Sequence, residues 1–267
     1  DSVDANGCSL SQLDTDNDGI SDASDQCPHT PAGETVDVNG CSGSQTTLPP
    51  DPATIAPKLD PTVATTQLSA TAFLYTGSNP IQTGGAEGTI ELKRVAVLRG
   101  KVMTRDGIPL SGVSMSIKDH PEFGQTLSRE DGMFDMAVNG GGWLTLNYSK
   151  QDYLPIQRKV DVPWQDYAWA EDVVMIALDS QVTTIDLNST VPFQIAQGSP
   201  VTDADGTRQA TLLFPQGTQA TMMMPSGSTQ TLSSLHVRAT EYTVGDNGPQ
   251  AMPGELPTSS GYTYALE

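Results

Sequence analysis

Between about residues 90 and 178, apolar and polar residues alternate in short runs that are separated by Gly- and Asp-containing turns. This period of two predicts strands in "RVAVLRGKVMT", "VSMSIKD", "MFDMAV", "WLTLNYSK", "YLPIQRKVDV" and "DVVMIALD". Short strands joined by tight turns are typical of an antiparallel β-sandwich, which we expect over residues 90–182. The expected core face consists of Val97, Val102, Val113, Met115, Ile117, Phe134, Met136, Val138, Leu144, Leu146, Tyr148, Val174 and Ile176.

The pattern changes on both sides of this domain. Residues 43–89 are rich in Pro, Thr and Ala, which predicts an extended linker with a short strand at "ATAFLYTG". Residues 183–267 return to short strands and turns, so we expect a second β domain there. Within it, "MMM" at 222–224 is expected to enter an apolar layer, and "DADG" at 203–206 to form a hairpin turn.

Charge separates the N-terminal segment from the rest of the chain. The formal net charge is −19, and residues 1–41 hold nine acidic residues, whereas the first basic residue is Lys58. Such a chain has no electrostatic reason to bind nucleic acid or anionic lipid, and divalent cations are the expected partners of the acidic segment. There is no apolar run long enough to insert into a membrane and no secretory leader, so we expect any export signal to lie outside this sequence.

The acidic residues cluster in "DTDNDGISDASDQCP" at 14–28. A twelve-residue calcium loop needs oxygen ligands at positions 1, 3, 5, 7, 9 and 12 and a glycine at position 6, and counting from Asp14 places Gly19 at that sixth position. An EF-hand or dockerin helix is not expected after the loop, because two prolines and a glycine follow it. The expected ligands are Asp14, Asp16, Asp18, the Ile20 carbonyl, Asp22 (directly or through water) and Asp25.

The segment also contains an internal repeat and all three cysteines of the chain. "VDANGCS" at 3–9 returns as "VDVNGCS" at 36–42, with the acidic loop between the copies. By that symmetry Cys27 pairs with Cys41, and Cys8 has its partner outside this chain. With the loop, the "TPAG" segment and the "VDVNGC" ending, residues 3–42 resemble the bacterial thrombospondin type 3 repeat, which implies a calcium-stiffened stalk over residues 1–42.

A second resemblance lies in the predicted sandwich. "LRGKVMTRDGIPLSGVSMSI", "TLSREDGMFDMAV" and "YSKQDYLP" resemble the carboxypeptidase regulatory-like domain, a transthyretin-like sandwich. Ser128 and Asp152 depart from that family's usual threonine and glycine, which affects local turn geometry. The resemblance implies a non-catalytic module. The predicted fold class is therefore mainly β: a calcium-binding loop repeat followed by antiparallel β-sandwich domains.

Candidate contact residues are grouped in "VPWQDYAWAED" at 162–172. Trp164, Tyr167 and Trp169 could stack on sugars or dock a partner, or they could cover one open end of the sandwich. No motif for a nucleophile, a zinc protease or a phosphate loop accompanies the three histidines, so we do not expect an enzyme.

The order of the parts carries a third resemblance. From about Ala70 to the end, the chain is similar to the region that precedes the shell in bacterial Rhs or YD-repeat proteins, which are relatives of teneurins. This resemblance implies that residues 183–267 are an incomplete, plug-like domain, and that its partner is a downstream shell of the same polypeptide or another extracellular protein. The expected function is a structural stalk and plug in a secreted or cell-surface protein, and the alternative is an adhesin or carbohydrate-contacting module.

Overall fold

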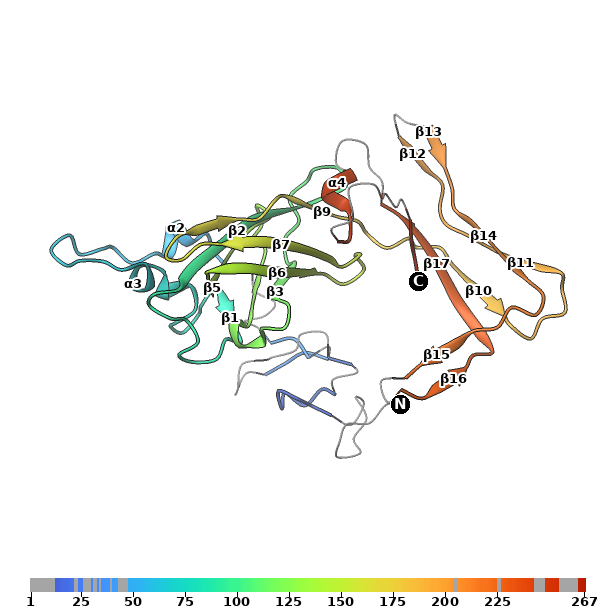
Figure 1. Cartoon of the computed structure of the whole chain (residues 1–267), viewed down its shortest axis with the longest axis horizontal. Coiled ribbons are helices and arrows are strands. Elements are labelled where there is room, and N and C mark those ends of the chain that lie inside the picture. Colours follow the sequence, from blue (N-terminus) through green and yellow to red (C-terminus); the bar gives the residue numbers. More distant parts are fainter. Residues whose placement is uncertain are drawn as a thin grey trace.

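The computed structural model describes residues 13–21, 24–25, 30, 33, 35–38, 40–42, 48–203, 206–224, 227–242, 248–254 and 264–267. Its strands form a sandwich in the middle of the chain and a set of long hairpins in the last third (Figure 1). Within the described residues, no helix is both long enough and apolar enough to cross a membrane. The fold class predicted from the sequence, mainly β with antiparallel sheets, is confirmed.

Two sheets make the sandwich. The first has the order β1-β4-β3-β6-β7, with β1 (Gln82–Thr83), β3 (Ser114–Ile117), β4 (Gln125–Leu127), β6 (Gly142–Ser149) and β7 (Ile156–Val162). The second has the order β5-β2-β8, with β2 (Val95–Thr104), β5 (Met133–Asn139) and β8 (Tyr167–Trp169), and β9 (Val173–Met175) also pairs with β2. Strands β8 and β9 both run parallel to β2, which the antiparallel sequence pattern did not indicate.

The sandwich core is dense and fully buried. Phe134 and Tyr148 meet edge to face across it, with ring centroids 5.8 Å apart. Gly100 allows this contact, because a Cβ at that position would lie 2.7 Å from the Phe134 ring. Nine of the thirteen residues expected in the core belong to this buried cluster: Val102, Val113, Met115, Ile117, Phe134, Met136, Val138, Leu146 and Tyr148.

The sequence placed Val97, Val174 and Ile176 on the core face of the sandwich, and this prediction was wrong. Val97 packs with Leu74 and Ile81 on the outer face of the second sheet, while Val174 and Ile176 join another cluster. Val95, Val97, Ala96 and Leu98 are all fully buried, so both faces of β2 are covered here and alternation does not identify the inner face. Leu144, the remaining predicted core residue, is partly buried against the core.

The cover of that outer face is helical, although a strand was predicted at "ATAFLYTG". Helix α3 (Gln67–Thr71) continues into the 3₁₀ helix η1 (Ala72–Leu74). Thr66 caps α3 in a reciprocal capping box with Ser69, which favours a helical start. The short helix α2 (Pro52–Ile55) precedes it, and η2 (Pro121–Phe123) lies between β3 and β4. The linker region therefore contributes to the sandwich through η1 and β1.

The last third forms the C-terminal β unit, defined here as strands β10 to β18 (Figure 1). Strands β10 (Val182–Asp186), β17 (Ser234–Glu241) and β18 (Tyr264–Leu266) form one sheet. The hairpins are β11 (Phe193–Gln197) with β14 (Thr211–Pro215), β12 (Val201–Asp203) with β13 (Gly206–Arg208), and β15 (Thr221–Met223) with β16 (Thr229–Thr231). A short helix α4 (Gly248–Ala251) lies between β17 and β18.

The C-terminal β unit has a small core of its own. Ile185, Ala196 and Val237 are buried together between the β10–β17 sheet and the β11–β14 hairpin. The expected apolar layer at "MMM" is not observed, because β15 pairs with β16 in a separate hairpin and Met223 is 77% exposed. The turn predicted at 203–206 is supported by the pairing of Asp203 with Gly206.

Candidate functional site

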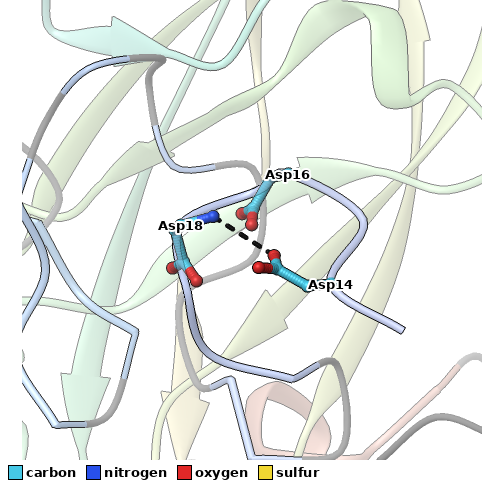
Figure 2. Close-up of side chains that lie close together, drawn as sticks. All are labelled: Asp14, Asp16 and Asp18. Atoms are coloured by element: carbon cyan, nitrogen blue, oxygen red, sulfur yellow. Dashed lines mark hydrogen bonds between the residues drawn. The ribbon is translucent and has the colours of Figure 1, made fainter. Parts of the chain in front are cut away.

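The acidic loop brings three of the predicted ligands together. Carboxylate oxygens of Asp14, Asp16 and Asp18 all lie within 4.8 Å of one another, as Figure 2 shows. The Asp14 carboxylate accepts backbone hydrogen bonds from Asp18 N (3.2 Å) and Gly19 N (2.9 Å). Gly19 has φ +95°, so the sharp turn at the sixth loop position uses a backbone conformation suited to glycine. The loop therefore bends so that the carboxylates converge.

Two further segments reach this loop. Thr30 donates from its backbone N to the Asp16 carboxylate (2.7 Å) and from its hydroxyl to that of Asp18 (3.2 Å). The Asp25 and Asp18 carboxylates both lie against Gly40, where a Cβ would come within 2.1 Å of Asp25 Oδ1 and 3.3 Å of Asp18 Oδ2. Asp25 is not part of the three-carboxylate cluster. Asp22, another predicted ligand, lies outside the described residues, and the Ile20 carbonyl has no contact that tests its predicted role.

Of the two cysteines in the predicted disulfide, only Cys41 lies within the described residues. Cys41 is disulfide-bonded, while Cys8 and Cys27 both lie outside the described residues. The pairing of Cys27 with Cys41 therefore stays a prediction.

The structure does not bring Trp164, Tyr167 and Trp169 into one cluster. Trp164 lies over the glycine turn between β5 and β6, where its Nε1 donates to Gly140 O (3.0 Å). A Cβ on Gly141, which has φ +100°, would lie 1.8 Å from Trp164 Nε1, so this turn needs glycine beneath the ring. Trp164 thus lies at one end of the sandwich. The interpretation that all three rings cover such an end does not describe Tyr167 and Trp169, which lie on β8.

Tyr167 and Trp169 lie instead on the outer face of the second sheet. They alternate with Ala168 on β8, where Tyr167 is opposite Val97 and Trp169 is opposite Arg99. The Arg99 guanidinium lies 4.7 Å from the centroid of the Tyr167 ring and forms an ion pair with the buried Asp135. One face of the Tyr167 ring is thus occupied by Arg99 of the same chain.

Sequence reasoning missed Trp143, the first tryptophan of the chain. It is 62% exposed at the start of β6, and Trp164 and Trp169 are 61% and 64% exposed. The available signal was its position directly after the "NGGG" turn, because a side chain beside such a turn lies at the rim of a sandwich. All three tryptophans are therefore largely accessible.

The described histidines do not form a catalytic pair. His120 Nδ1 lies 2.8 Å from Glu122 Oε1, and this hydrogen bond, with a backbone hydrogen bond within Glu122, lowers the pKa of the Glu122 carboxyl below its ordinary value. His236 is on β17, where its Nδ1 lies 3.1 Å from the Thr184 hydroxyl. His29 lies outside the described residues.

The C-terminal β unit is attached to the sandwich through buried charge. The Glu241 side chain, 2% exposed, forms ion pairs with Arg105 of the sandwich (3.4 Å) and Arg208 of the unit (3.1 Å). Arg158 on β7 donates to the carbonyls of Gln250 and Met252 (both 2.7 Å). Beside these bonds, Leu154, Val174 and Ile176 of the sandwich pack with Tyr242 and Ala251.

The opposite side of the unit presents apolar side chains to solvent. On the β11–β14 hairpin, Phe193, Ile195 and Leu213 are 61%, 54% and 60% exposed. Ile195 and Leu213 are direct cross-strand partners, so they share one face. We call these three residues the outer hairpin face.

The chain is similar to the teneurins over part of its length. The family model of the teneurin TTR-like domain matches residues 90–175, which correspond to most of the sandwich. Teneurin-3 of Danio rerio is 33% identical over 153 residues, which cover 55% of this chain and 5% of that protein. Teneurin-m of Drosophila melanogaster is 33% identical over 163 residues, 61% of this chain and 6% of that protein. The chain thus spans about a twentieth of the length of these relatives.

Solved structures show only distant likeness. A 3-chlorocatechol 1,2-dioxygenase from Rhodococcus opacus is 9% identical with a TM-score of 0.28, covering 35% of this chain and 64% of that one. A streptococcal ancillary pilin is 11% identical with the same TM-score of 0.28, covering 55% of this chain and 53% of that one. Similarity at this level does not bear on function. The similarity to known proteins therefore lies in a teneurin TTR-like domain over residues 90–175.

Proposed function

We propose that this chain is a non-catalytic structural segment of a secreted or cell-surface protein of the Rhs/YD-repeat type, to which teneurins are related. In this proposal the sandwich holds the C-terminal β unit as a plug against a β-shell made by another part of the same polypeptide. The observation that carries it is the contrast between the two sides of the unit. One side is fastened to the sandwich through Glu241, and the other presents the outer hairpin face.

The exposed side chains support a docking role because of where they lie. Single exposed apolar residues are normal on a protein surface, whereas neighbours on one hairpin face indicate a contact surface. Phe193, Ile195 and Leu213 do not belong to the small core of the unit, which lies on the other side of the hairpin. A shell wall would cover them without disturbing that core.

The first test is the gene itself. The proposal expects tyrosine-aspartate repeats to be encoded after Glu267, and their absence would count against a shell. If they are present, hydrogen exchange of β11 and β14 should slow when the complete polypeptide is compared with residues 1–267. Equal exchange in the two samples would show that the shell does not cover this hairpin.

We further propose that the N-terminal segment is a calcium-stiffened stalk, closed by a disulfide between Cys27 and Cys41. The proposed ligands are Asp14, Asp16, Asp18, the Ile20 carbonyl, Asp22 and Asp25. Support comes from the three carboxylates that converge within 4.8 Å, because like charges at this separation repel unless a cation lies between them.

Calorimetric titration of residues 1–267 with calcium tests the stalk. Asp18→Asn should weaken binding at least tenfold, because it removes a charged ligand from the centre of the loop. Asp106→Asn, in an exposed turn of the sandwich, is the matched control and should bind calcium as the unaltered chain does. Absence of calcium uptake, or equal affinity in both variants, would refute the site.

A second candidate function is an extracellular adhesin or carbohydrate-contacting module. It is favoured by one observation, the exposure of all three tryptophans above 60%. Aromatic rings left open to solvent are typical of surfaces that stack on flat ligands. This function does not exclude the structural one, since the tryptophans and the outer hairpin face belong to different parts of the fold.

A further inference from the structure

A polar pocket of about 530 Å³ lies beside the glycine turn at one end of the sandwich. Three short segments line it: 89–94, 120–123 and 139–144, the last of which includes the start of β6. Its volume falls within the range of small-molecule sites, roughly 300–1,000 Å³. The side chains that give the pocket its chemistry are Glu91, Arg94, His120, Glu122 and Trp143.

Trp143 is the exposed aromatic residue among those that line this pocket. Most of its side chain is exposed, and its ring is held by Lys159 of the neighbouring strand, whose Nζ lies 5.1 Å from the ring centroid. A cation over an indole ring contributes attraction that restrains the ring orientation. Trp164 and Trp169 are not among the residues that line this pocket.

An ion pair and a hydrogen bond form the polar rim. Arg94 and Glu91 form the ion pair at 3.5 Å, and His120 Nδ1 lies 2.8 Å from Glu122 Oε1. The four side chains are between 42% and 55% exposed, so each pair keeps donor or acceptor surface open to solvent. Glu122 is a carboxylate at neutral pH and therefore acts as a hydrogen-bond acceptor.

The rim is fixed by bonds to the backbone behind it. Asn139 accepts from Glu91 N and donates to Thr89 O, both at 2.8 Å. Gly140 N donates to Arg94 O (2.7 Å), and Arg94 Nε donates in return to Gly140 O (3.2 Å). A binding site whose polar groups are already positioned loses less conformational entropy when a ligand binds.

We propose that this pocket binds a neutral saccharide, with the apolar face of a sugar ring on Trp143 and its hydroxyl groups hydrogen-bonded to Glu91, Arg94 and Glu122. A pyranose carries both a flat CH surface and a rim of hydroxyls, which matches one aromatic wall beside acceptors and a donor. Acidic sugars fit less well, because the rim holds two carboxylates and the whole chain carries a net charge of −19. The inference deepens the second proposed function and is independent of the shell.

The test uses residues 1–267 and saturation-transfer NMR with glucose, galactose, mannose, N-acetylglucosamine and their linear trisaccharides, followed by calorimetry of the binders. Trp143→Ala should weaken binding about tenfold or more, the loss of one stacked ring being about 1.4 kcal/mol. Trp143→Tyr should retain affinity within a few fold, because it keeps an aromatic face. Glucuronic acid should bind more weakly than glucose.

The matched control is Trp169→Ala, which removes an equally exposed indole from the outer face of the second sheet and should leave affinity unchanged. Glu122→Gln should lower affinity without removing the ring, which keeps the inference testable if Trp143→Ala fails to fold. Lack of binding by every sugar in the panel would overturn the inference. Binding lost in Trp169→Ala but kept in Trp143→Ala would also overturn it, while leaving the carbohydrate-contacting function in place.

Discussion

The sandwich and the C-terminal β unit are built from the same kinds of short strand and turn, but they use their apolar residues differently. In the sandwich, two sheets enclose a core in which Phe134, Tyr148 and Met115 are at most 1% exposed. In the C-terminal unit, the core is reduced to Ile185, Ala196 and Val237 with partly buried neighbours, and residues of similar size face solvent. The sandwich can therefore stabilise itself, whereas the unit depends on what it touches.

The largest effect is expected from the sandwich core. Phe134→Ala should lower the free energy of unfolding by about 3–5 kcal/mol, because it leaves a cavity beside Tyr148 and Gly100. Ile185→Ala in the small core of the unit should lower it by about 2 kcal/mol, since nearby side chains there can shift into the space. Urea unfolding followed by circular dichroism measures both. Equal losses in the two variants would contradict the difference between the regions.

A smaller effect is expected at the attachment between them. Glu241→Gln removes the charge that joins Arg105 to Arg208, and should lower stability by about 2 kcal/mol, less than for a fully buried pair because both arginines are partly exposed. Hydrogen exchange should speed up in β10 and β17 while β2 and β5 stay protected. Glu130→Gln, an exposed carboxylate of the sandwich, is the control. A uniform increase across both regions would mean that they unfold as one unit.

The smallest effect concerns Asp179, which follows β9 at the junction. Its partial burial acts to raise the carboxyl pKa, but hydrogen bonds from Gln181 N and from Ser199 N and Oγ, with the charge of Arg238, bring the pKa below its ordinary value of 3.8. A lowered folded-state pKa stabilises the fold above the unfolded-state pKa, and this stabilisation is lost as the pH falls through the folded-state value.

At pH 7, Asp179→Asn should therefore lower the free energy of unfolding by about 1 kcal/mol or less, because the carboxylate is partly solvated. The difference from the unaltered chain should shrink as the pH falls below 4. Urea unfolding at pH 7 and at pH 3 provides the measurement. A difference that grows toward acid would show that the carboxylate is not the stabilising group.

The sequence predicted the strands of the sandwich well because their alternation reflects burial on one face. It failed at β2, where η1 buries the outer face as well, so that Val97 and Leu98 are equally buried and their pattern carries no direction. The strand predicted at "ATAFLYTG" was also wrong. A capping box at Thr66 and contact with the sheet favour a helix there. Tertiary contacts of this kind cannot be read from local periodicity.

The candidate sites show the same division. Asp14, Asp16 and Asp18 converge as their spacing predicted, because a loop with ligands at alternate positions folds around one point. The aromatic residues that the sequence grouped do not converge. Trp164 and Trp169 are only five positions apart, but they lie on different surfaces of the sandwich. Trp143 could not be grouped with Glu91 and Glu122 from the sequence, because only the packing of the two sheets brings those segments together.

The parallel pairing of β2 with β8 and β9 has a consequence for biosynthesis. Val97 meets Tyr167, and Val102 meets Val173, about seventy residues later in the chain. At ribosomal rates of roughly 5–20 residues per second, one edge of β2 waits about 4–14 s for its partner. An apolar strand left open for that time is prone to aggregate. Arg99, Gly100 and Lys101 interrupt the apolar run of β2. We expect this interruption to reduce aggregation of the strand before the sheet closes.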